Sequence, residues 1–428
     1  MTPIVVIACP THPGHTNPLL PHAAYLTKQG FEVHFIGGEA FAPGIEQTGA
    51  SFHPTEDFPL PLELFDLPPT PERFMSELKQ VFVDTTPARM DALKRLLESL
   101  RTAHPDRDVV ILQELMYMGV WPYLQGAPLP AGYTTFPPVI TISTVPMVIS
   151  SIDTAPFGPG LPPDASPEGR ARHAAMYAAG KPLMDDFLQY TNSTYATLGA
   201  TEPVTRAIFD HWSLGTGRFL QPCSPSLEYP RSDLSPAVTF IGALPRKDLS
   251  SELPEGLIPE GNTRKIVFVT QGTISLDYTA LLVPTIEALA DREDLLVIGV
   301  LGVKGASLDI KLPANARVLD YLAYDAILPC TDVFVSNGGY GGFLHGVMHA
   351  VPMVLAGEGQ DKAEVATRGE WAGIAVDLKT NRPSVEQIKQ SVDGVLKDSQ
   401  MKTRCLAIKK ENQDLDCFKQ VEKAIMQA

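Results

Sequence analysis

The chain has 428 residues, which at about 150 residues per domain allows two or three domains. Its 49 acidic residues outnumber 34 lysines and arginines, and a formal charge of −15 repels phosphate backbones, which argues against nucleic-acid binding. Apolar residues make up 44% of the chain and charged residues 19%, so we expect an ordinary globular protein and not a disordered one.

The cysteines and the N-terminus indicate a cellular compartment. Five cysteines are dispersed with no CxxC pair, so they predict neither a disulfide framework nor a zinc site. The first strand begins directly after Met-Thr-Pro, without the basic and apolar regions of a signal peptide. No apolar run approaches the roughly 20 residues of a membrane span. We therefore expect a cytoplasmic protein with no stable membrane insertion.

Short β-branched runs alternate with helical patterns along the chain. Continuous apolar strands separated by helices are typical of parallel sheets covered on both faces. In the first half the predicted strands are residues 4–8, 31–36, 109–112 and 139–143, and in the second half 266–270, 295–300, 333–336, 353–355 and 374–376.

The pattern occurs twice and predicts an α/β protein with two Rossmann-like domains. Residues 1–221 form the first domain and residues 247–400 the second. A Pro/Ser-rich linker, residues 222–246, joins them, and residues 401–428 form a C-terminal helix. Three Pro-rich stretches, 58–62, 67–71 and 155–164, read as long loops whose apolar side chains favour pocket walls over disorder.

Two histidines, His12 and His15, lie in the turn after the first predicted strand, where α/β sheets place their active sites. This turn has one glycine, Gly14, so it lacks the GxGxxG pattern of NAD and FAD enzymes. Histidine is the natural general base near neutral pH. The alternative is that both are loop histidines with local hydrogen bonds.

A glycine-rich turn, Asn337-Gly-Gly-Tyr-Gly-Gly, follows the predicted strand 333–336 and precedes a helix expected from Phe343 to His349. Glycines here free backbone amides to face an anion at a helix N-terminus, although they could equally serve tight packing. After the next strand, Asp361 and Lys362 are expected at the same sheet edge, where a carboxylate could bind sugar hydroxyls. The alternative for Asp361 is a solvated helix N-cap.

Taken together, these motifs resemble the family 1 nucleotide-sugar glycosyltransferases over nearly the whole chain, in a fungal or bacterial subgroup. The resemblance implies the GT-B fold, with an acceptor-binding first domain, a donor-binding second domain and a last helix that returns to the first. Gly14-His-Thr-Asn-Pro is similar to the family's His-x-x-Pro turn, which makes His15 the catalytic base and leaves His12 unmatched. The carboxylate that orients this base is usually Asp, and here Glu114 takes its place.

The second half resembles the donor-binding signature of the family. Tyr321 takes the position of the aromatic residue that stacks on uracil, and Asn337 and His345 replace a diphosphate-binding His and a ribose-binding Glu. Asp361-Lys362 replaces the pair that holds the sugar. The donor-binding residues implied by the resemblance are Gly272, Thr273, Tyr321, Leu322, Asn337, Gly338, Gly339, Tyr340, Gly341, Gly342, His345, Gln360, Asp361 and Lys362.

The resemblance implies an inverting glycosyltransferase that moves a hexose, with glucose expected, from a UDP-sugar to a hydroxyl of an apolar small molecule such as a phenolic or polyketide. His15 and Glu114 are the catalytic residues, and no cofactor or metal is expected. An Asp414-Leu-Asp416 motif lies in the C-terminal helix and reads as a solvated face. The predicted acceptor-binding residues, Met116, Tyr117, Trp121 and Phe136, follow Glu114, although each could instead be ordinary core.

Two other classes of function stay open at this point. A nucleotide-sugar epimerase would share the domains but need no acceptor pocket. A non-catalytic protein that binds nucleotide-sugars or apolar molecules would fit the replaced signature residues, but His15 together with an acidic partner argues against it.

Overall fold

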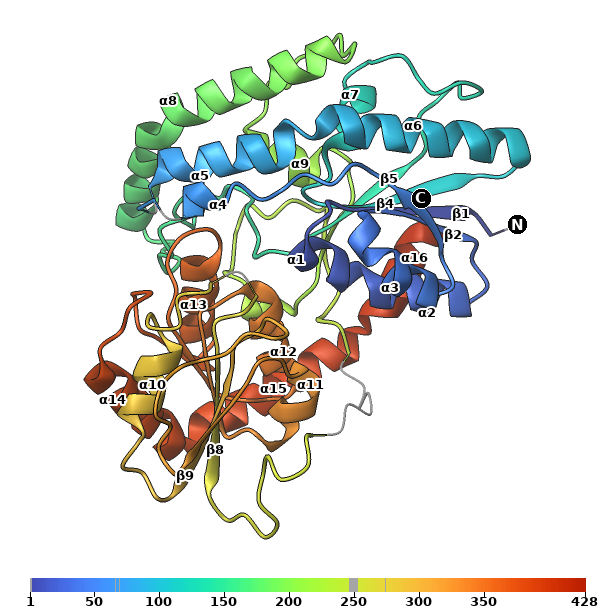
Figure 1. Cartoon of the computed structure of the whole chain (residues 1–428). Helices are drawn as coiled ribbons and strands as arrows, with labels where there is room; N and C mark the ends of the chain where they lie inside the picture. The colour runs from blue at the N-terminus through green and yellow to red at the C-terminus, as the bar shows by residue number, and fades with distance from the viewer. Residues whose placement is uncertain (1, 66, 69, 246–252, 274) are drawn as a thin grey trace.

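A computed structural model describes residues 2–428 except 66, 69, 246–252 and 274. Two parallel sheets lie one above the other, each covered by helices (Figure 1). The expected α/β fold with two Rossmann-like domains is therefore confirmed. In the described part of the chain, no helix has the length and apolar character required to cross a membrane.

The first sheet has seven strands in the order β3-β2-β1-β4-β5-β6-β7, and every pair is parallel. Its strands are β1 (Ile4–Ala8), β2 (Val33–Gly37), β3 (Ser51–Pro54), β4 (Val109–Glu114), β5 (Val139–Ile142), β6 (Phe219–Gln221) and β7 (Val238–Phe240). Its helices are α1 (Pro13–Thr16), α2 (Leu20–Lys28), α3 (Ala42–Gln47), α4 (Leu62–Phe65), α5 (Pro71–Leu78), α6 (Thr86–Ala103), α7 (Trp121–Leu124), α8 (Pro167–Thr197) and α9 (Ile208–Leu214).

The second sheet has six strands in the order β10-β9-β8-β11-β12-β13, again all parallel. Its strands are β8 (Lys265–Thr270), β9 (Leu295–Val300), β10 (Ala316–Leu319), β11 (Val333–Ser336), β12 (Met353–Leu355) and β13 (Ala375–Asp377). The helices of this half are α10 (Leu282–Ala288), α11 (Tyr324–Ile327), α12 (Tyr340–Met348), α13 (Lys362–Trp371), α14 (Val385–Lys397), α15 (Ser399–Leu415) and α16 (Cys417–Met426).

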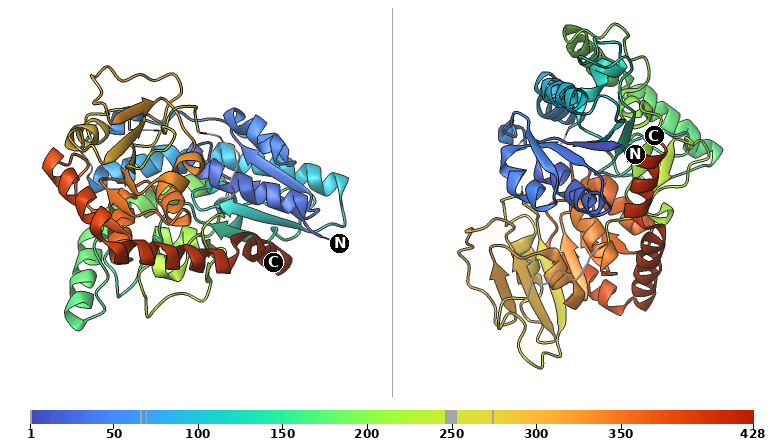
Figure 2. Two further views of the ribbon diagram at one scale, coloured as in Figure 1. Left: turned by 90° about the horizontal axis from the view of Figure 1, so that it is seen from below. Right: turned by 90° about the vertical axis from the view of Figure 1, so that its right-hand side faces the viewer.

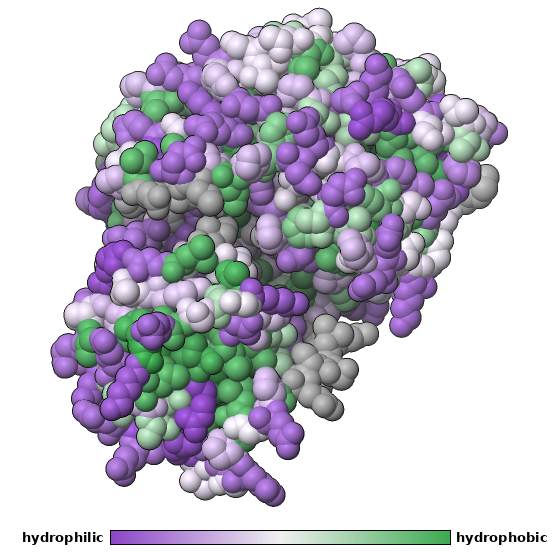
Figure 3. Space-filling model, viewed as in Figure 1, coloured by the Kyte–Doolittle hydropathy of each residue, from purple (hydrophilic) through white to green (hydrophobic). Residues whose placement is uncertain are grey.

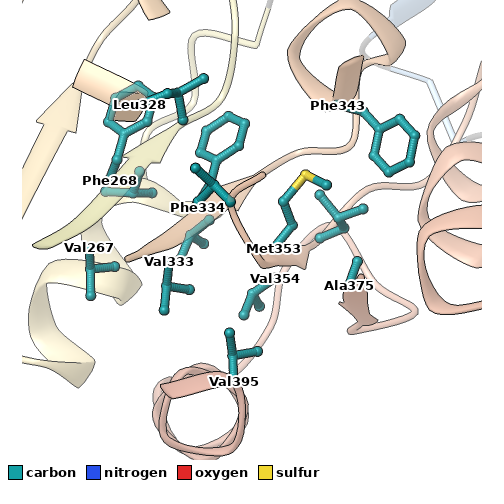
Figure 4. Packing of buried hydrophobic residues seen from close by; sticks show 14 of the residues in the cluster. Val267, Phe268, Leu328, Val333, Phe334, Phe343, Met353, Val354, Ala375 and Val395 are labelled. Atoms are coloured by element: carbon teal, nitrogen blue, oxygen red, sulfur yellow. The ribbon is translucent and has the colours of Figure 1, made fainter. Parts of the chain in front are cut away.

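The inner strands are buried on both faces, as their continuous apolar runs predict, while the edge strands β3, β7 and β10 are partly exposed. In the second domain the rings of Phe268 and Phe334 stack on neighbouring strands, and Val395 of α14 approaches the sheet beside Val354 (Figure 4). On the outer surface, apolar side chains gather on one face of the second domain among polar ones (Figure 3).

The first sheet extends further along the chain than the sequence predicts. Strand β7 pairs with β6 in the first sheet, so that sheet continues into the range predicted as a linker, residues 222–246. The last position of that range, 246, lies outside the described residues.

The C-terminal segment contains two helices, not one. They are divided at Asp416, which has a left-handed φ of 53° and whose carboxylate accepts a hydrogen bond from Lys419 N. These helices run along both domains (Figure 2). The last of them, α16, packs on α2 of the first domain, where Phe418 stacks on Tyr25 with 4.9 Å between ring centroids.

Candidate active site

A histidine–carboxylate pair stands at the carboxyl edge of the first sheet. Because β1 and β4 are parallel neighbours, the turn after β1 and the end of β4 meet at one edge. His15 Nδ1 lies 3.0 Å from Glu114 Oε1, and the Glu114 carboxylate is fully buried. The structure thus brings together the two residues predicted to be catalytic.

Glu114 is held in place by two further contacts. Its Oε1 accepts a hydrogen bond of 2.6 Å from Thr144 Oγ1, and its Oε2 accepts one of 2.8 Å from Met116 N. Thr144 follows β5, the next strand of the sheet, and its Oγ1 also lies 3.3 Å from His15 Nδ1. Sequence reasoning missed Thr144, although its place just after a predicted strand could have indicated it.

The electrostatic environment favours a protonated His15. Burial by itself lowers the pKa of His15, but the Glu114 carboxylate raises it by its charge and hydrogen bond. The charge of Asp361, from the second domain, raises it further, and the net shift of the His15 pKa is upward. The ring edge of His15 packs against Phe82, whose ring centroid lies 5.3 Å away. Phe82 belongs to a single π-helical turn, Lys79–Val83, of the kind often found at functional sites.

The pKa of His12 is shifted in the opposite direction from that of His15. Burial, together with the nearby His15 and Arg89, lowers its pKa to about 4, so it is neutral at pH 7. Within the part of the chain that the structure describes, its buried Nε2 has no hydrogen-bond partner. Among the described residues no carboxylate contacts this ring as Glu114 contacts His15, which favours His15 as the base.

The turns predicted to hold the donor meet at the carboxyl edge of the second sheet. Asn337 Nδ2 donates a hydrogen bond of 2.5 Å to Gln271 O, which joins the turn after β11 to the turn after β8. Gly272, with a φ of 75°, lies next to Asn337, since a Cβ atom at Gly272 would be 3.9 Å from Asn337 Nδ2. Thr273, next to it, is exposed.

The glycine-rich turn is itself the start of a helix. Helix α12 begins at Tyr340 with Gly339 as its N-cap, not at Phe343 as the sequence predicts. Gly341 and Gly342 therefore lie in its first turn, where backbone amides have no partner within the helix. A Cβ atom at Gly341 would meet no other atom within 4 Å, so the helix start faces open space. This geometry fits an anion-binding helix N-terminus.

Asp361 is the N-cap residue of α13, and its charge acts on His15 of the first domain. The amide of Tyr340 hydrogen-bonds its carboxylate, and burial raises its pKa although the neighbouring Lys362 opposes this. Burial lowers the pKa of Lys362, whose Nζ donates to Gln360 Oε1 at 2.7 Å. Gln360 has a φ of 51°, so a left-handed residue turns the chain into α13. The structure therefore gathers Gln360, Asp361 and Lys362 beside the glycine-rich turn.

The other predicted donor residues differ in their surroundings. Tyr321, after β10, is 48% exposed, with Lys304 Nζ 5.1 Å from its ring centroid, while the neighbouring Leu322 is buried. Tyr340 is buried, and its hydroxyl accepts a hydrogen bond from Gln221 of the first domain. His345 Nδ1 lies 2.9 Å from Asp325 Oδ1, the same oxygen that His349 Nε2 contacts.

The predicted acceptor residues need correction. Tyr117 and Trp121 are completely buried in the core of the first domain, and the Tyr117 hydroxyl donates to Arg89 O. Met116 is 8% exposed, and Phe136 stacks on Tyr123 with 4.8 Å between ring centroids. None of the four lines the large cavity described next. These residues do not reach the cavity because the chain after Glu114 packs against α6 of its own domain.

The large cavity lies elsewhere, between the two domains. It has a volume of about 1,410 Å³ and is bounded by α5, α8, α9, the loop 156–162 and the segment 357–379. Most of its wall is apolar, for example Phe74, Phe157, Phe209 and Trp371, and Arg73 and Glu77 supply charged groups. The Pro-rich loop 155–164 was predicted to form a pocket wall, and this is confirmed. The contributions of α5, α8 and α9 were missed.

The described residues contain no group of three or more His, Cys, Asp or Glu side chains arranged to hold a metal ion. In the Asp414-Leu-Asp416 motif, Asp414 pairs with Lys410 on the surface and Asp416 caps α16.

Comparison with known proteins decides the family. The chain is 39% identical to UDP-glucosyltransferase 1 of Beauveria bassiana over 99% of its length and 94% of that protein's. It is 32% identical to 4'-demethylrebeccamycin synthase of Lentzea aerocolonigenes over 95% of both chains. The chain belongs to the family 1 glycosyltransferases.

The remaining comparisons agree with this UDP-glycosyltransferase assignment. Residues 285–427 match the family model described as "Erythromycin biosynthesis protein CIII-like, C-terminal domain". Among solved structures, the glycosyltransferase of kitacinnamycin superposes with a TM-score of 0.74 at 20% identity, covering 100% of this chain and 99% of that one. The expected GT-B fold is thus confirmed, while the roles of the individual site residues stay predictions.

Proposed function

We propose that this UDP-glycosyltransferase inverts the anomeric centre as it transfers glucose from UDP-glucose to a hydroxyl of an apolar small molecule, with His15 as general base. The observation that carries the proposal is the His15–Glu114 pair, with 3.0 Å between Nδ1 and Oε1, and the charge of Asp361 from the second domain also acts on His15. The relatives from Beauveria bassiana and Starmerella bombicola are named UDP-glucosyltransferases, which supports glucose as the sugar.

The proposed chemistry begins with the acceptor. A hydroxyl is a poor nucleophile at neutral pH, so a base must take its proton as the oxygen attacks the anomeric carbon. Neutral His15 does this through Nε2 while its Nδ1–H donates to Glu114. The carboxylate fixes this tautomer and stabilises the imidazolium that forms. Attack from the face opposite the nucleotide turns an α-linked donor into a β-linked product.

Negative charge then develops on the leaving diphosphate. The first-turn amides of α12 and the Asn337 side chain lie at the sheet edge where the diphosphate is proposed to bind. Amide dipoles at a helix N-terminus stabilise such charge without a metal ion. Asp361 and Lys362, beside them, are proposed to hold the sugar hydroxyls.

The acceptor is proposed to bind in the apolar cavity between the domains. Its volume of about 1,410 Å³ exceeds the usual size of small-molecule pockets, roughly 300–1,000 Å³. Residues 357–360, which lead directly into Asp361 and Lys362, line this cavity together with Arg73 and Glu77 of α5. This end of the cavity therefore adjoins the turn proposed to hold the sugar, and the apolar body of the acceptor is proposed to occupy the rest.

The test is a panel of UDP- and TDP-sugars against alizarin, an apolar phenolic, with products identified by mass spectrometry. We expect glucosylated alizarin from UDP-glucose, a β-linkage by NMR, and undiminished turnover in excess EDTA. Free UDP should appear only when an acceptor is present, which distinguishes transfer from epimerisation. An α-linked product would contradict inversion. Loss of activity in EDTA that magnesium or manganese restores would contradict metal independence.

A further inference from the structure

A loop of the first domain forms hydrogen bonds with a helix of the second domain. We call this loop, residues 156–162, the strap. The amides of Gly158 and Gly160 donate hydrogen bonds of 2.8 and 2.9 Å to Glu364 Oε1 of α13. In the opposite direction, Thr367 Oγ1, one turn further along α13, donates a hydrogen bond of 2.7 Å to Gly160 O. We call these three hydrogen bonds the clip.

The clip depends on close approach of the two backbones. Gly160 has a φ of 60°, and a Cβ atom there would lie 2.7 Å from Ala363 O. Glu364 is buried, and its second oxygen, Oε2, lies 2.7 Å from Arg368 Nη1. The carboxylate is therefore held by an ion pair on one side while its other oxygen receives both strap amides.

The strap and α13 each have a second task in the proposed reaction. All seven strap residues line the acceptor cavity, and so do Ala363, Thr367 and Trp371 of α13. At its other end, α13 begins at Lys362 with Asp361 as its N-cap, beside His15 and the glycine-rich turn. One helix of ten residues thus joins the cavity wall to the turn proposed to hold the sugar.

We propose that Glu364 and Thr367 are positioning residues that couple acceptor binding to donor binding, an inference that rests on the proposed function. The clip exists only when the two domains stand as close as they do here. An acceptor that contacts both the strap and α13 binds this arrangement better than an open one, and the same arrangement sets Asp361 opposite His15. By thermodynamic linkage, a bound acceptor then tightens donor binding, and the donor tightens acceptor binding by the same factor.

Two variants weaken the clip and leave the Glu364–Arg368 ion pair in place. Thr367→Val removes one of the three hydrogen bonds at nearly constant volume, together with the 3.3 Å bond from Thr367 Oγ1 to Asp377 Oδ2. Gly160→Ala places a methyl group against Ala363 O. Thr367→Ser keeps the hydroxyl and should restore wild-type behaviour. The control for the glycine variant is Gly394→Ala in α14, where an added Cβ meets nothing within 4 Å.

The first measurement is the Kd of UDP by calorimetry, with and without saturating alizarin. In the wild type and in Gly394→Ala we expect alizarin to tighten UDP binding by about fivefold or more, as is typical of coupled sites. In Thr367→Val and Gly160→Ala this ratio should fall close to one. An unchanged ratio in both clip variants, or no coupling in the wild type, would overturn the inference.

The second measurement is hydrogen exchange of the strap amides without any ligand. Gly158 and Gly160 should exchange slowly in the wild type, and at least about tenfold faster in both clip variants. Equal exchange in all proteins would contradict the clip itself. Failure of the wild type to bind UDP would instead contradict the proposed function, and the exchange data would still show whether the clip forms.

Discussion

At the scale of single residues, the side chain of Glu114, longer than that of aspartate, still places its carboxylate 3.0 Å from His15 Nδ1. Its extra methylene is accommodated because the carboxylate is bound at both ends, by Thr144 and His15 on Oε1 and by Met116 N on Oε2. Both oxygens thus have fixed partners, so the carboxylate has a defined position from which to orient the imidazole.

The raised pKa of His15 predicts a pH dependence. The base must be neutral, so kcat/KM should fall as the pH drops through the His15 pKa, with a midpoint above the ordinary value of about 6.5. Glu114→Gln removes the charge that raises this pKa, while burial still lowers it, so the midpoint should move to lower pH. The plateau rate should fall as well, on the order of 10²-fold or more, because the imidazolium loses its partner.

The measurement is kcat/KM for alizarin against pH in the two proteins. Asp108→Asn serves as a control, because Asp108 is exposed just before β4 and should leave the profile unchanged. A midpoint that stays in place or rises in Glu114→Gln would show that Glu114 does not set the His15 pKa.

At the scale of elements, His345 of α12 and His349 at its C-cap share a single carboxylate oxygen. Because His345 and His349 both contact Asp325 Oδ1 at 2.9 Å, their polar surroundings are similar. Only His345 occupies the position implied to bind ribose. His345→Ala should therefore raise the donor KM by roughly tenfold, the effect of one lost hydrogen bond, with a smaller change in kcat.

Steady-state kinetics with varied UDP-glucose would measure this effect, and His349→Ala is the matched control. The control should keep its donor KM within about twofold of the wild type, since one hydrogen bond is worth roughly tenfold. Equal donor KM values in the two variants would remove His345 from the ribose site.

The elements also show what could be predicted from sequence and what could not. Strands with continuous apolar runs were predictable, because a parallel sheet buries such runs and places every strand end at one edge. The short or partly exposed strands β3, β6, β7 and β10 were missed. The shared edge is why His15 and Glu114 could be expected to lie close together from the sequence alone. The start of α12 at Tyr340 was missed, because glycines in a first helical turn look like a loop.

The acceptor cavity was harder to predict. Nearness in sequence to Glu114 suggested Tyr117 and Trp121, yet both side chains point into the core. The cavity proposed to bind the acceptor is instead bounded by α5, α8 and α9, which are distant in sequence from His15 and Glu114. Only tertiary packing brings these helices together, so no local sequence pattern could have predicted that they surround one cavity.

At the scale of the whole molecule, a buried ion network joins the domains. Arg368 of α13 contacts Glu364 on its own helix and Glu228, which follows β6 of the first sheet, and all three side chains are buried. Arg368→Met would remove the ion-pair partner of two buried carboxylates, which typically costs about 3–5 kcal/mol. Urea denaturation should show this loss of stability.

The control is Lys410→Ala, which breaks an exposed ion pair on α15 and should hardly change the urea midpoint of unfolding. An Arg368→Met protein as stable as the wild type would mean that the network does not hold the domains together.

The central claim is that His15 deprotonates the acceptor at the cleft between the domains, and one variant tests it most directly. In His15→Ala, kcat with UDP-glucose and alizarin should fall by roughly 10²–10⁴-fold, the usual contribution of a general base, while the Kd of UDP stays unchanged. His12→Ala should be much milder, because His12 has no carboxylate partner. A near-normal kcat in His15→Ala, or a larger loss in His12→Ala, would contradict the account.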